Sequence, residues 1–343
     1  MDYRKLPGTE LEVPVLTLGT GTFGGSHGYE GWGHTDVEGA RRLVDIATEA
    51  GLCMFDTADS YSHGTSEEIL GKAIAHKQRD KVMISTKVGF PMSDRPDDRG
   101  ASRTHIIESC EGSLRRLGTD YIDLYYIHIF DNTVEVEETM RALDDLVKAG
   151  KVRSIGCSNY SGWHLMKSES VADANGLTRF CAHQAYYSLL HREFEWELMS
   201  AGVDQHVGTI VWSPLAAGRL AGRYRRGKGI PEDGRVASHG VPIEDFLVDY
   251  DKLYDIVDVL DEIAGETGHT VAQVALNWVL QRPTVTSLVI GARTEEHLKS
   301  NLGATGWNLT AEQVKRLDGV SQQVKSYPYW HQDVCPLMKS QLF

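Results

Sequence analysis

Eight short apolar segments recur along the chain, and each is followed by a pattern typical of a helix. The segments are Val15–Gly19, Cys53–Phe55, Val82–Thr86, Tyr121–Ile127, Val152–Gly156, Phe180–His183, Thr209–Trp212 and Ser287–Ile290. They are apolar throughout rather than alternating, which is typical of strands covered on both faces. The sequence therefore predicts an α/β fold built around eight strands.

Helix signals fill the intervals between these segments. A capping-box pattern formed by Thr35 and Glu38 opens the helical segment Val37–Ala50, and the same device recurs at Thr65 and Glu68. Most strand-to-strand intervals are about thirty to forty residues long, which is the repeat of a strand–helix unit.

One interval is longer than the others. The chain between the seventh and eighth segments is predicted to hold a glycine- and arginine-rich loop, 218–240, and extra helices over Leu253–Thr267 and Val271–Leu280. The leading segments Tyr3–Leu6 and Leu11–Pro14 predict a small hairpin before the first strand.

Eight strand–helix alternations can close into a barrel or lie open as a doubly wound sheet, and periodicity does not separate the two. The length of 343 residues is also ambiguous, because α/β barrels of this size fold as one domain. No linker or low-complexity tract divides the sequence, so we expect a single domain over residues 1–343.

The charge balance excludes several classes of partner. With 35 Lys and Arg against 48 Asp and Glu, the formal net charge is -13, which repels phosphate backbones and anionic lipid. We find no apolar run long enough to cross a bilayer, and no His-x-x-x-His or His-Glu-x-x-His pattern for a metal. We expect a cytoplasmic protein with no nucleic-acid, membrane or metal partner.

Residues 19–24 match the glycine pattern of a dinucleotide-binding turn, G-x-G-x-x-G. In that motif a helix begins within the turn and presents its amides to the pyrophosphate, whereas here helix signals begin only at Thr35. The segment is therefore predicted to be a loop after the first strand.

Ionisable residues follow three successive strand segments. Asp56 and Tyr61 come after the second, Lys87 ends the third, and His128 ends the fourth. The carboxyl ends of barrel strands are where barrel enzymes carry their catalytic groups. Taken singly, each residue has another common explanation: Asp56 can form a turn, Tyr61 can pack in a loop, and Lys87 can be a solvated charge at the rim of the barrel.

Together the four residues predict a proton donor. A tyrosine with its ordinary pKa of about 10 is a weak acid at neutral pH, but a nearby ammonium favours the phenolate. Lys87 would supply that ammonium, Asp56 would pair with it, and His128 would share with Tyr61 the oxygen of a carbonyl substrate.

The motifs 55-FDTADSY-61, 64-GTSEEILG-71, 85-STK-87 and 123-DLYYIH-128 resemble the signature of the aldo-keto reductase family over nearly the whole chain. The branch it resembles includes potassium-channel β subunits and related bacterial reductases. The resemblance implies a (β/α)8 TIM barrel with an N-terminal hairpin, extra helices between strands seven and eight, and a C-terminal loop. It also implies that Tyr61 is the general acid and that His128 orients the substrate. Lys87 and Asp56 are then the pair that lowers the pKa of Tyr61.

The resemblance further implies a nicotinamide dinucleotide across the open end of the barrel. Ser158, Asn159 and Gln184 match the family's carboxamide ligands, and Trp212 matches the aromatic on which the nicotinamide stacks. The remaining residues expected at the cofactor are Thr20, Gly21, Asp56, Ser213, Pro214, Leu215, Gly218, Arg223, Arg235, Gly291, Arg293, His297 and Asn301.

Positive charge favours NADP(H) over NAD(H). Arg223, Arg235 and Arg293 are expected near the pyrophosphate and the 2′-phosphate. The chain departs from the branch at His297, where Gln is usual, and at Ser300, where an acid is usual.

Aromatic residues on several loops are expected around a substrate mouth: Trp32, Phe90, Phe130, Tyr329 and Trp330. They suit an uncharged, moderately large carbonyl compound. The C-terminal aromatic residues are equally typical of an oligomer contact or a docked terminus, and a homo-oligomer is possible.

Two functions from different classes follow. The first is reversible, NADPH-dependent reduction of an aldehyde or ketone. The second is a cofactor-loaded regulatory or partner-binding subunit in which turnover is incidental. The intact four-residue cluster favours the enzyme, and a metal-dependent sugar isomerase is disfavoured because paired carboxylate and histidine ligands are missing.

Overall fold

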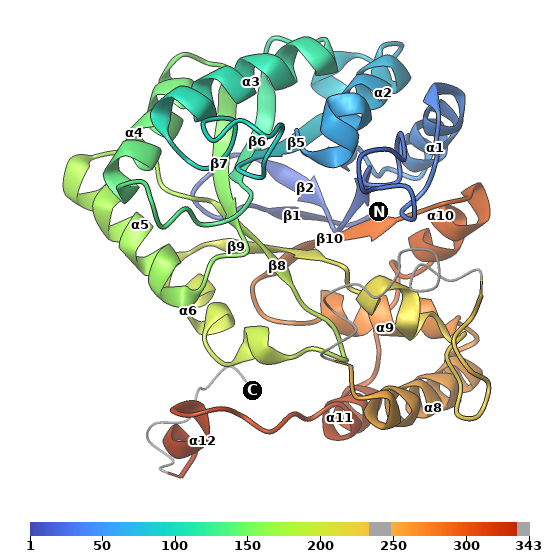
Figure 1. Ribbon diagram of the computed structural model, residues 1–343. Helices are drawn as coiled ribbons and strands as arrows, with labels where there is room; N and C mark the ends of the chain where they lie inside the picture. Colours follow the sequence, from blue (N-terminus) through green and yellow to red (C-terminus); the bar gives the residue numbers. More distant parts are fainter. Residues whose placement is uncertain (233–247, 335–343) are drawn as a thin grey trace.

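A computed structural model describes residues 1–232 and 248–334. Eight parallel strands close into a barrel in chain order, and the last strand pairs with the first (Figure 1). The barrel strands are β3 (Leu16–Gly19), β4 (Met54–Asp56), β5 (Met83–Val88), β6 (Ile122–Ile127), β7 (Val152–Ser158), β8 (Ala182–Tyr186), β9 (Gly208–Trp212) and β10 (Val285–Gly291). The eight predicted strands and the closed TIM barrel are therefore confirmed.

Helices surround the barrel (Figure 1). They are α1 (Val37–Glu49), α2 (Thr65–Ile74), α3 (Arg103–Leu117), α4 (Val136–Lys148), α5 (Gly162–Asn175), α6 (Leu198–Gln205), α8 (Tyr250–Thr267), α9 (Val271–Leu280), α10 (Glu295–Leu302), α11 (Ala311–Val320) and α12 (Tyr329–Gln332). Short 3-10 turns are η1 (Tyr61–Gly64), η2 (Arg79–Lys81), η3 (Glu193–Glu195) and η4 (Ala216–Ala221).

The predicted N-terminal hairpin is present and covers the end of the barrel where the strands begin. Strands β1 (Tyr3–Lys5) and β2 (Glu12–Pro14) pair antiparallel. Leu6 and Val13 of the hairpin are completely buried and belong to one apolar cluster with Leu124 and Ile210 from the barrel interior. This plug leaves the carboxyl end of the strands as the open end.

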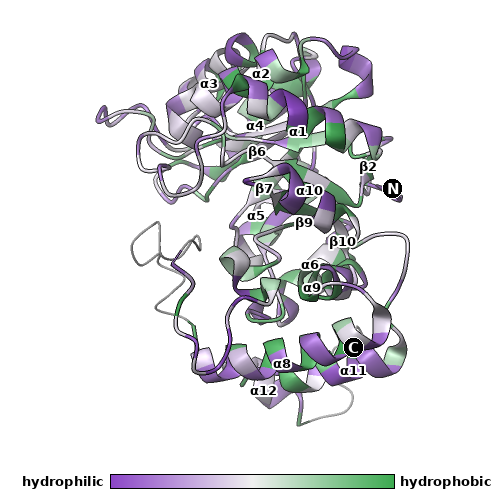
Figure 2. Ribbon diagram, turned by 90° about the vertical axis from the view of Figure 1, so that its right-hand side faces the viewer, coloured by the Kyte–Doolittle hydropathy of each residue, from purple (hydrophilic) through white to green (hydrophobic). Residues whose placement is uncertain are grey.

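The predicted extra helices also occupy their place between β9 and β10. Helix α9 buries nearly every residue, which is typical of a helix packed on all sides. Helix α8 buries only one face, and hydrophobic and hydrophilic residues alternate along it (Figure 2). It packs against α9 on one side and α11 on the other, so α8 and α11 form an outer layer. The predicted C-terminal loop follows α11 and carries α12.

The two predicted capping boxes are wrong. Helix α1 is capped by Asp36, whose side chain accepts a hydrogen bond from Gly39 N at 2.8 Å. Thr35 is instead bridged to Phe23, which fixes it in an extended loop. Helix α2 begins at Thr65 itself, because the turn η1 runs directly into it through Gly64 at φ 86°.

No helix in residues 1–232 and 248–334 combines the length and apolar character needed to cross a membrane.

The hairpin plug makes a stability prediction. We expect Leu6→Ala to lower the free energy of unfolding by about 2–5 kcal/mol, because it leaves a cavity at the closed end of the barrel. Urea unfolding followed by circular dichroism measures this. Leu11→Ala is the matched control, since Leu11 is only partly buried against the same cluster, and its loss should be smaller. Equal losses of unfolding free energy for the two variants would contradict the proposed contribution of the plug to stability.

Candidate active site

Alternation along the strands decides which side chains reach the open end of the barrel. Successive side chains of a strand point to opposite faces, so residues two apart share a face. Ser85 and Lys87 of β5 both make contacts with Asp56, the last residue of β4. Asp56 pairs in register with Ser85. Lys87, two residues further along β5, shares the face of Ser85 and therefore lies next to the Asp56 carboxylate.

The Lys87 ammonium is completely buried and fully hydrogen-bonded. Its Nζ donates to Asp56 Oδ2 at 2.6 Å, to the Thr57 carbonyl at 2.7 Å and to Tyr61 OH at 3.3 Å. Burial alone lowers the pKa of Lys87, but the Asp56 carboxylate and the Tyr61 hydroxyl outweigh it, so the pKa lies above its ordinary value. Lys87 therefore stays charged, with its three donors aimed at three acceptors.

Asp56 is held by more than its ion pair. Its Oδ1 accepts from Ser85 Oγ at 2.7 Å and from Gln184 Nε2 at 2.9 Å. Ser85 was missed by the sequence analysis, although its place two residues before Lys87 puts it on the same strand face. These bonds fix the carboxylate between β4, β5 and β8.

The turn η1 sets the direction of Tyr61. Ser62 and His63 both have φ of 50°, a left-handed conformation that side chains other than glycine seldom adopt. The buried Ser62 hydroxyl holds this turn, since it donates to the Phe23 carbonyl and accepts from Gly25 N and Ser26 N. The strained turn thus projects the Tyr61 ring toward Lys87, whose Nζ lies 4.9 Å from the ring centroid.

A buried acid supports the same turn from behind. Glu67, in the first turn of α2, accepts from Thr86 Oγ1 at 2.6 Å and from Arg116 Nε at 2.7 Å. Its neighbour Ser66 donates to the Thr20 carbonyl at 2.9 Å. The Thr-Ser-Glu segment of the motif therefore ties together β5, α3 and the loop after β3.

His128 lies at the end of β6, beside Tyr61. The two ring centroids are 5.9 Å apart, and Phe90 packs edge-on against the imidazole at 4.5 Å. Burial and then the nearby Lys87 charge hold the pKa of His128 well below its ordinary value, so the ring is neutral at pH 7. No partner is found for the buried Nδ1 among the residues that the structure describes.

Asn159 links His128 to Trp212. Its side-chain Nδ2 donates to the His128 carbonyl at 3.0 Å, and its Oδ1 accepts from Trp212 Nε1 at 3.0 Å. The backbone φ of Asn159 is 54°, so the residue turns back over the end of β7. Tyr186 stacks on Trp212 with ring centroids 4.6 Å apart and fixes the plane of the indole.

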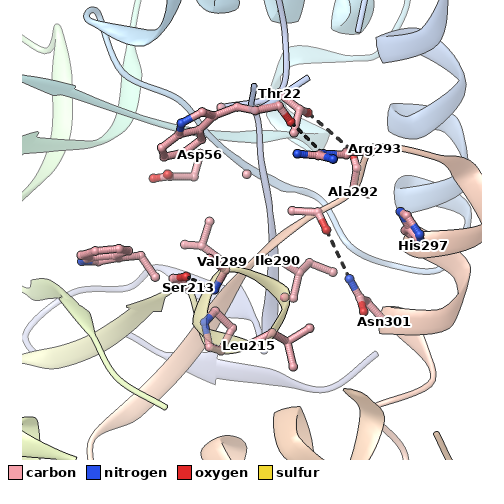
Figure 3. Close-up of a pocket in the computed structure, with 18 of the residues that line it drawn as sticks. Thr22, Asp56, Ser213, Leu215, Val289, Ile290, Ala292, Arg293, His297 and Asn301 are labelled. Atoms are coloured by element: carbon pink, nitrogen blue, oxygen red, sulfur yellow. Dashed lines mark hydrogen bonds between the residues drawn. The ribbon is translucent and has the colours of Figure 1, made fainter. Parts of the chain in front are cut away.

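These residues border a cavity of about 910 Å³, near the upper end of the size usual for small-molecule and cofactor sites. It runs from Asp56 at one end to His297 and Asn301 at the other (Figure 3). The predicted cofactor residues that line it are Gly21, Asp56, Ser158, Asn159, Gln184, Trp212, Ser213, Pro214, Leu215, Gly218, Arg223, Gly291, Arg293, His297 and Asn301. Tyr61, His128, Trp32 and Phe90 line it as well.

Other predicted residues lie elsewhere. Thr20 is buried beneath the cavity, where its hydroxyl bonds to the Asp56 carbonyl and to Ser66. Phe130 stacks on His164 at 3.7 Å, because the chain after β6 turns it toward α5. Tyr329 lies against Trp196, and neither it nor Trp330 lines the cavity. Arg235 falls outside the described residues.

Several cavity residues were missed by the sequence analysis. Tyr29, from the loop after β3, lies 5.5 Å from Tyr61 between ring centroids. Its proximity in sequence to Trp32 was the available signal. Val289 and Ile290 of β10 and Thr270 before α9 also line the cavity, but nothing in their sequence context distinguishes them from core residues. No cluster of three metal-ligating side chains occurs in residues 1–232 and 248–334.

Fold and site together define a barrel protein with a Lys–Asp–Tyr–His cluster at the open end of its strands. The sequence profile of the Aldo/keto reductase family matches residues 15–322, and the chain belongs to this family. It is accordingly an oxidoreductase of the aldo/keto reductase type, a family that generally works with a nicotinamide cofactor.

Individual relatives extend over almost the whole chain. An uncharacterized oxidoreductase of Bacillus subtilis, YrpG, is 36% identical over 93% of this chain and 96% of its own length. The versiconal hemiacetal acetate reductase of Aspergillus parasiticus is 34% identical over 93% of this chain and 96% of its own length. A probable voltage-gated potassium channel subunit beta of Oryza sativa is 36% identical over 94% of this chain and 97% of its own length. The resemblance recognised in the motifs, branch included, is confirmed.

A second buried histidine makes the stability of the site depend on pH. His183 of β8 accepts a hydrogen bond from Tyr160 N at 3.3 Å, and burial lowers its pKa to about 4. Since the unfolded side chain has a pKa of about 6.5, the unfolded state binds the proton first as pH falls. Stability is therefore lost as pH falls from about 6.5 toward 4.

We expect His183→Gln to weaken this dependence. Between pH 7 and pH 5 the wild type should lose about 2 kcal/mol more unfolding free energy than the variant, as the pKa difference requires. Urea unfolding at the two pH values measures the difference. A loss of equal size in both proteins would show that His183 is not the titrating group.

Proposed function

We propose that this protein reduces an aldehyde or ketone to the alcohol with NADPH, reversibly, and that Tyr61 supplies the proton. The observation that carries the proposal is the Lys87 ammonium, which lies 3.3 Å from Tyr61 OH and 2.6 Å from Asp56 at one end of the cavity. Bound nicotinamide supplies the hydride. Side chains of this protein donate the proton, stabilise the phenolate that remains on the proton donor and bind the carbonyl oxygen.

Proton transfer rests on Tyr61 and Lys87. As the carbonyl carbon gains hydride, its oxygen gains the π electrons and needs a proton, which the Tyr61 hydroxyl gives. The phenolate left behind faces the Lys87 ammonium, whose charge stabilises it until solvent returns a proton. Asp56 keeps Lys87 charged and oriented throughout.

His128 serves as a neutral hydrogen-bond donor. An imidazole with a pKa far below 6.5 cannot act as an acid at neutral pH, but its N–H can bind the carbonyl oxygen. Tyr61 and His128 thus converge on one oxygen, and burial of His128 strengthens its hydrogen bond by excluding water.

The cavity suits a nicotinamide dinucleotide. Ser158, Asn159 and Gln184 place hydroxyl and amide groups at the Asp56 end, which fits a carboxamide, and the Trp212 ring provides an apolar face beside them. At the far end, a Cβ built on Gly291 would meet nothing within 4 Å, so the strand end leaves open space before α10. Ser213, Pro214, Leu215 and Gly218 form the wall between the two ends.

Cationic groups that line the cavity favour NADP(H) over NAD(H). Arg223 and Arg293 both line the cavity, and a guanidinium binds phosphate oxygens with paired, charge-assisted hydrogen bonds. His297 and Asn301 line the same cavity at the end away from Asp56, and Asn301 donates to the Gly291 carbonyl at 3.3 Å (Figure 3).

The substrate mouth is aromatic on two sides. Trp32 and Tyr29 form one wall and Phe90 the other, around Tyr61 and His128. This lining suits an uncharged, moderately large carbonyl compound. The reductase among the relatives acts on a hemiacetal acetate by its name, which is compatible with such a mouth.

Tyr61→Phe tests the proton donor. We expect the variant to keep its affinity for NADPH and to lose turnover by about 10²- to 10⁴-fold, because only the acidic hydroxyl is gone. NADPH absorbance with a panel of aldehydes and ketones measures the rate, and fluorescence titration measures cofactor affinity. Tyr125→Phe is the control, since it removes a hydroxyl from the outer face of β6 that bonds to the Ile106 carbonyl. Equal rates for Tyr61→Phe and wild type would remove the assignment.

Similarity to potassium-channel subunits supports a second candidate, a cofactor-loaded regulatory subunit. The same assay separates the two functions. A wild-type protein that binds NADPH but oxidises it with no carbonyl compound in the panel would favour the regulatory subunit.

Arg293→Ala tests the cofactor preference. We expect the variant to weaken NADPH binding by about 10- to 100-fold and NADH binding much less, because one charge-assisted contact to the 2′-phosphate is lost. Dissociation constants for both dinucleotides measure this. A parallel loss for both would exclude the 2′-phosphate role.

A further inference from the structure

The loop between β3 and α1 covers the substrate mouth and is closed at its base. Phe23 is bridged to Thr35, Gly24 N donates to the Thr35 carbonyl at 3.1 Å, and Thr35 N donates to the Thr22 carbonyl at 3.0 Å. Residues 24–34 therefore form a closed loop, called here the Trp32 loop.

The tip of the Trp32 loop carries the aromatic wall of the mouth. Trp32 lies 6.3 Å from Tyr61 and 5.3 Å from Tyr29 between ring centroids. Its ring also lies close to Gly21, where an added Cβ would come within 2.9 Å of it. The position of this loop thus decides the shape of the space in front of Tyr61.

The Trp32 loop is only partly buried. None of residues 24–34 is fully buried. The large cavity borders it through Tyr29 and Trp32, and a second cavity of about 570 Å³ borders it through Glu30, Gly31 and Gly33. With a cavity on each side, individual contacts contribute to holding the loop in its position.

One of these contacts comes from the far end of the cofactor cavity. Arg293, which lines both cavities, donates from Nη2 to the Gly31 carbonyl at 2.6 Å and from Nε to the Trp32 carbonyl at 3.1 Å. Figure 3 shows the guanidinium of Arg293 on the side of the cavity where Thr22 lies. Further contacts of the loop run from the Ser62 hydroxyl to Gly25 N and Ser26 N, from the His27 ring to the His63 ring on which it stacks at 4.2 Å, and from Tyr29 to Tyr61.

We propose that Arg293 is a positioning residue of the substrate mouth: its forked bonds to Gly31 and Trp32 hold the Trp32 loop against Tyr61 and so set which carbonyl substrates fit. This role deepens the proposed function and rests on it for the identity of the substrate. The guanidinium suits the task because its two adjacent N–H groups meet two successive carbonyls, which a lysine ammonium cannot do with the same geometry. Residues near the cofactor's phosphates thereby act on the substrate end through one loop.

Hydrogen exchange in the protein without added ligands tests the anchoring directly. The Trp32 amide, which donates to the Tyr29 carbonyl at 2.9 Å, should exchange about 10-fold faster or more in Arg293→Ala than in wild type. Arg293→Lys should lie between the two, because it keeps the charge and loses the fork. Arg42→Ala is the matched control, since Arg42 also lines the smaller cavity but pairs with Glu295. Wild-type exchange in Arg293→Ala would overturn the proposal.

Substrate selection tests the consequence. With each dinucleotide at saturation, Arg293→Ala should raise KM for a bulky aromatic aldehyde about 10-fold more than for a small aliphatic aldehyde. Arg42→Ala should leave this ratio as in wild type. An unchanged ratio in Arg293→Ala would overturn the proposal even if exchange were faster. If wild type turns over no carbonyl compound, the proposed function fails, and the exchange measurement still decides whether Arg293 holds the loop.

Discussion

The buried ion pair of Lys87 and Asp56 is the interaction on which the rest of the site depends. Burying an ammonium costs several kcal/mol unless every donor finds an acceptor, and breaking such a pair by removing one partner typically costs about 3–5 kcal/mol. Here the carboxylate, the Thr57 carbonyl and the Tyr61 hydroxyl satisfy all three donors. The Tyr61 hydroxyl is thus one of the three acceptors that offset the cost of burying Lys87.

The barrel supplies the positions that this pair requires. Parallel strands in register bring Asp56 beside Ser85 and Ser158 beside Gln184, so polar side chains from distant segments meet at one end. The hairpin closes the opposite end with Leu6 and Val13. The polar cluster and the apolar hairpin plug therefore lie at opposite ends of the barrel. Loops at the open end can vary in sequence without changing the packing of the plug.

The strands and the Lys–Asp–Tyr–His cluster could be predicted because their signals are local. An apolar run marks each strand, and an ionisable residue at its end marks the open face. The substrate wall could not be predicted in the same way. Phe130 follows a strand just as Phe90 does, yet it turns onto His164, because its direction depends on the path of the chain toward α5. Ser85 could have been predicted from alternation alone, whereas the bonds from Arg293 to Gly31 and Trp32 join residues 262 and 261 positions apart.

That last contact joins the end of the cavity where we propose that the cofactor's phosphates bind to the end where we propose that the substrate binds. Strand β10 is the barrel neighbour of β3, so the loops that follow them lie side by side although they are the last and first of the barrel in sequence. Closure of the barrel is what brings Arg293 to the Trp32 loop; in an open sheet the two strands would lie at opposite edges or be separated by others. A guanidinium on the loop after β10 therefore borders both cavities and bonds to the backbone that carries Trp32. The coupling between the two ends follows from the topology, and the choice of arginine makes it specific.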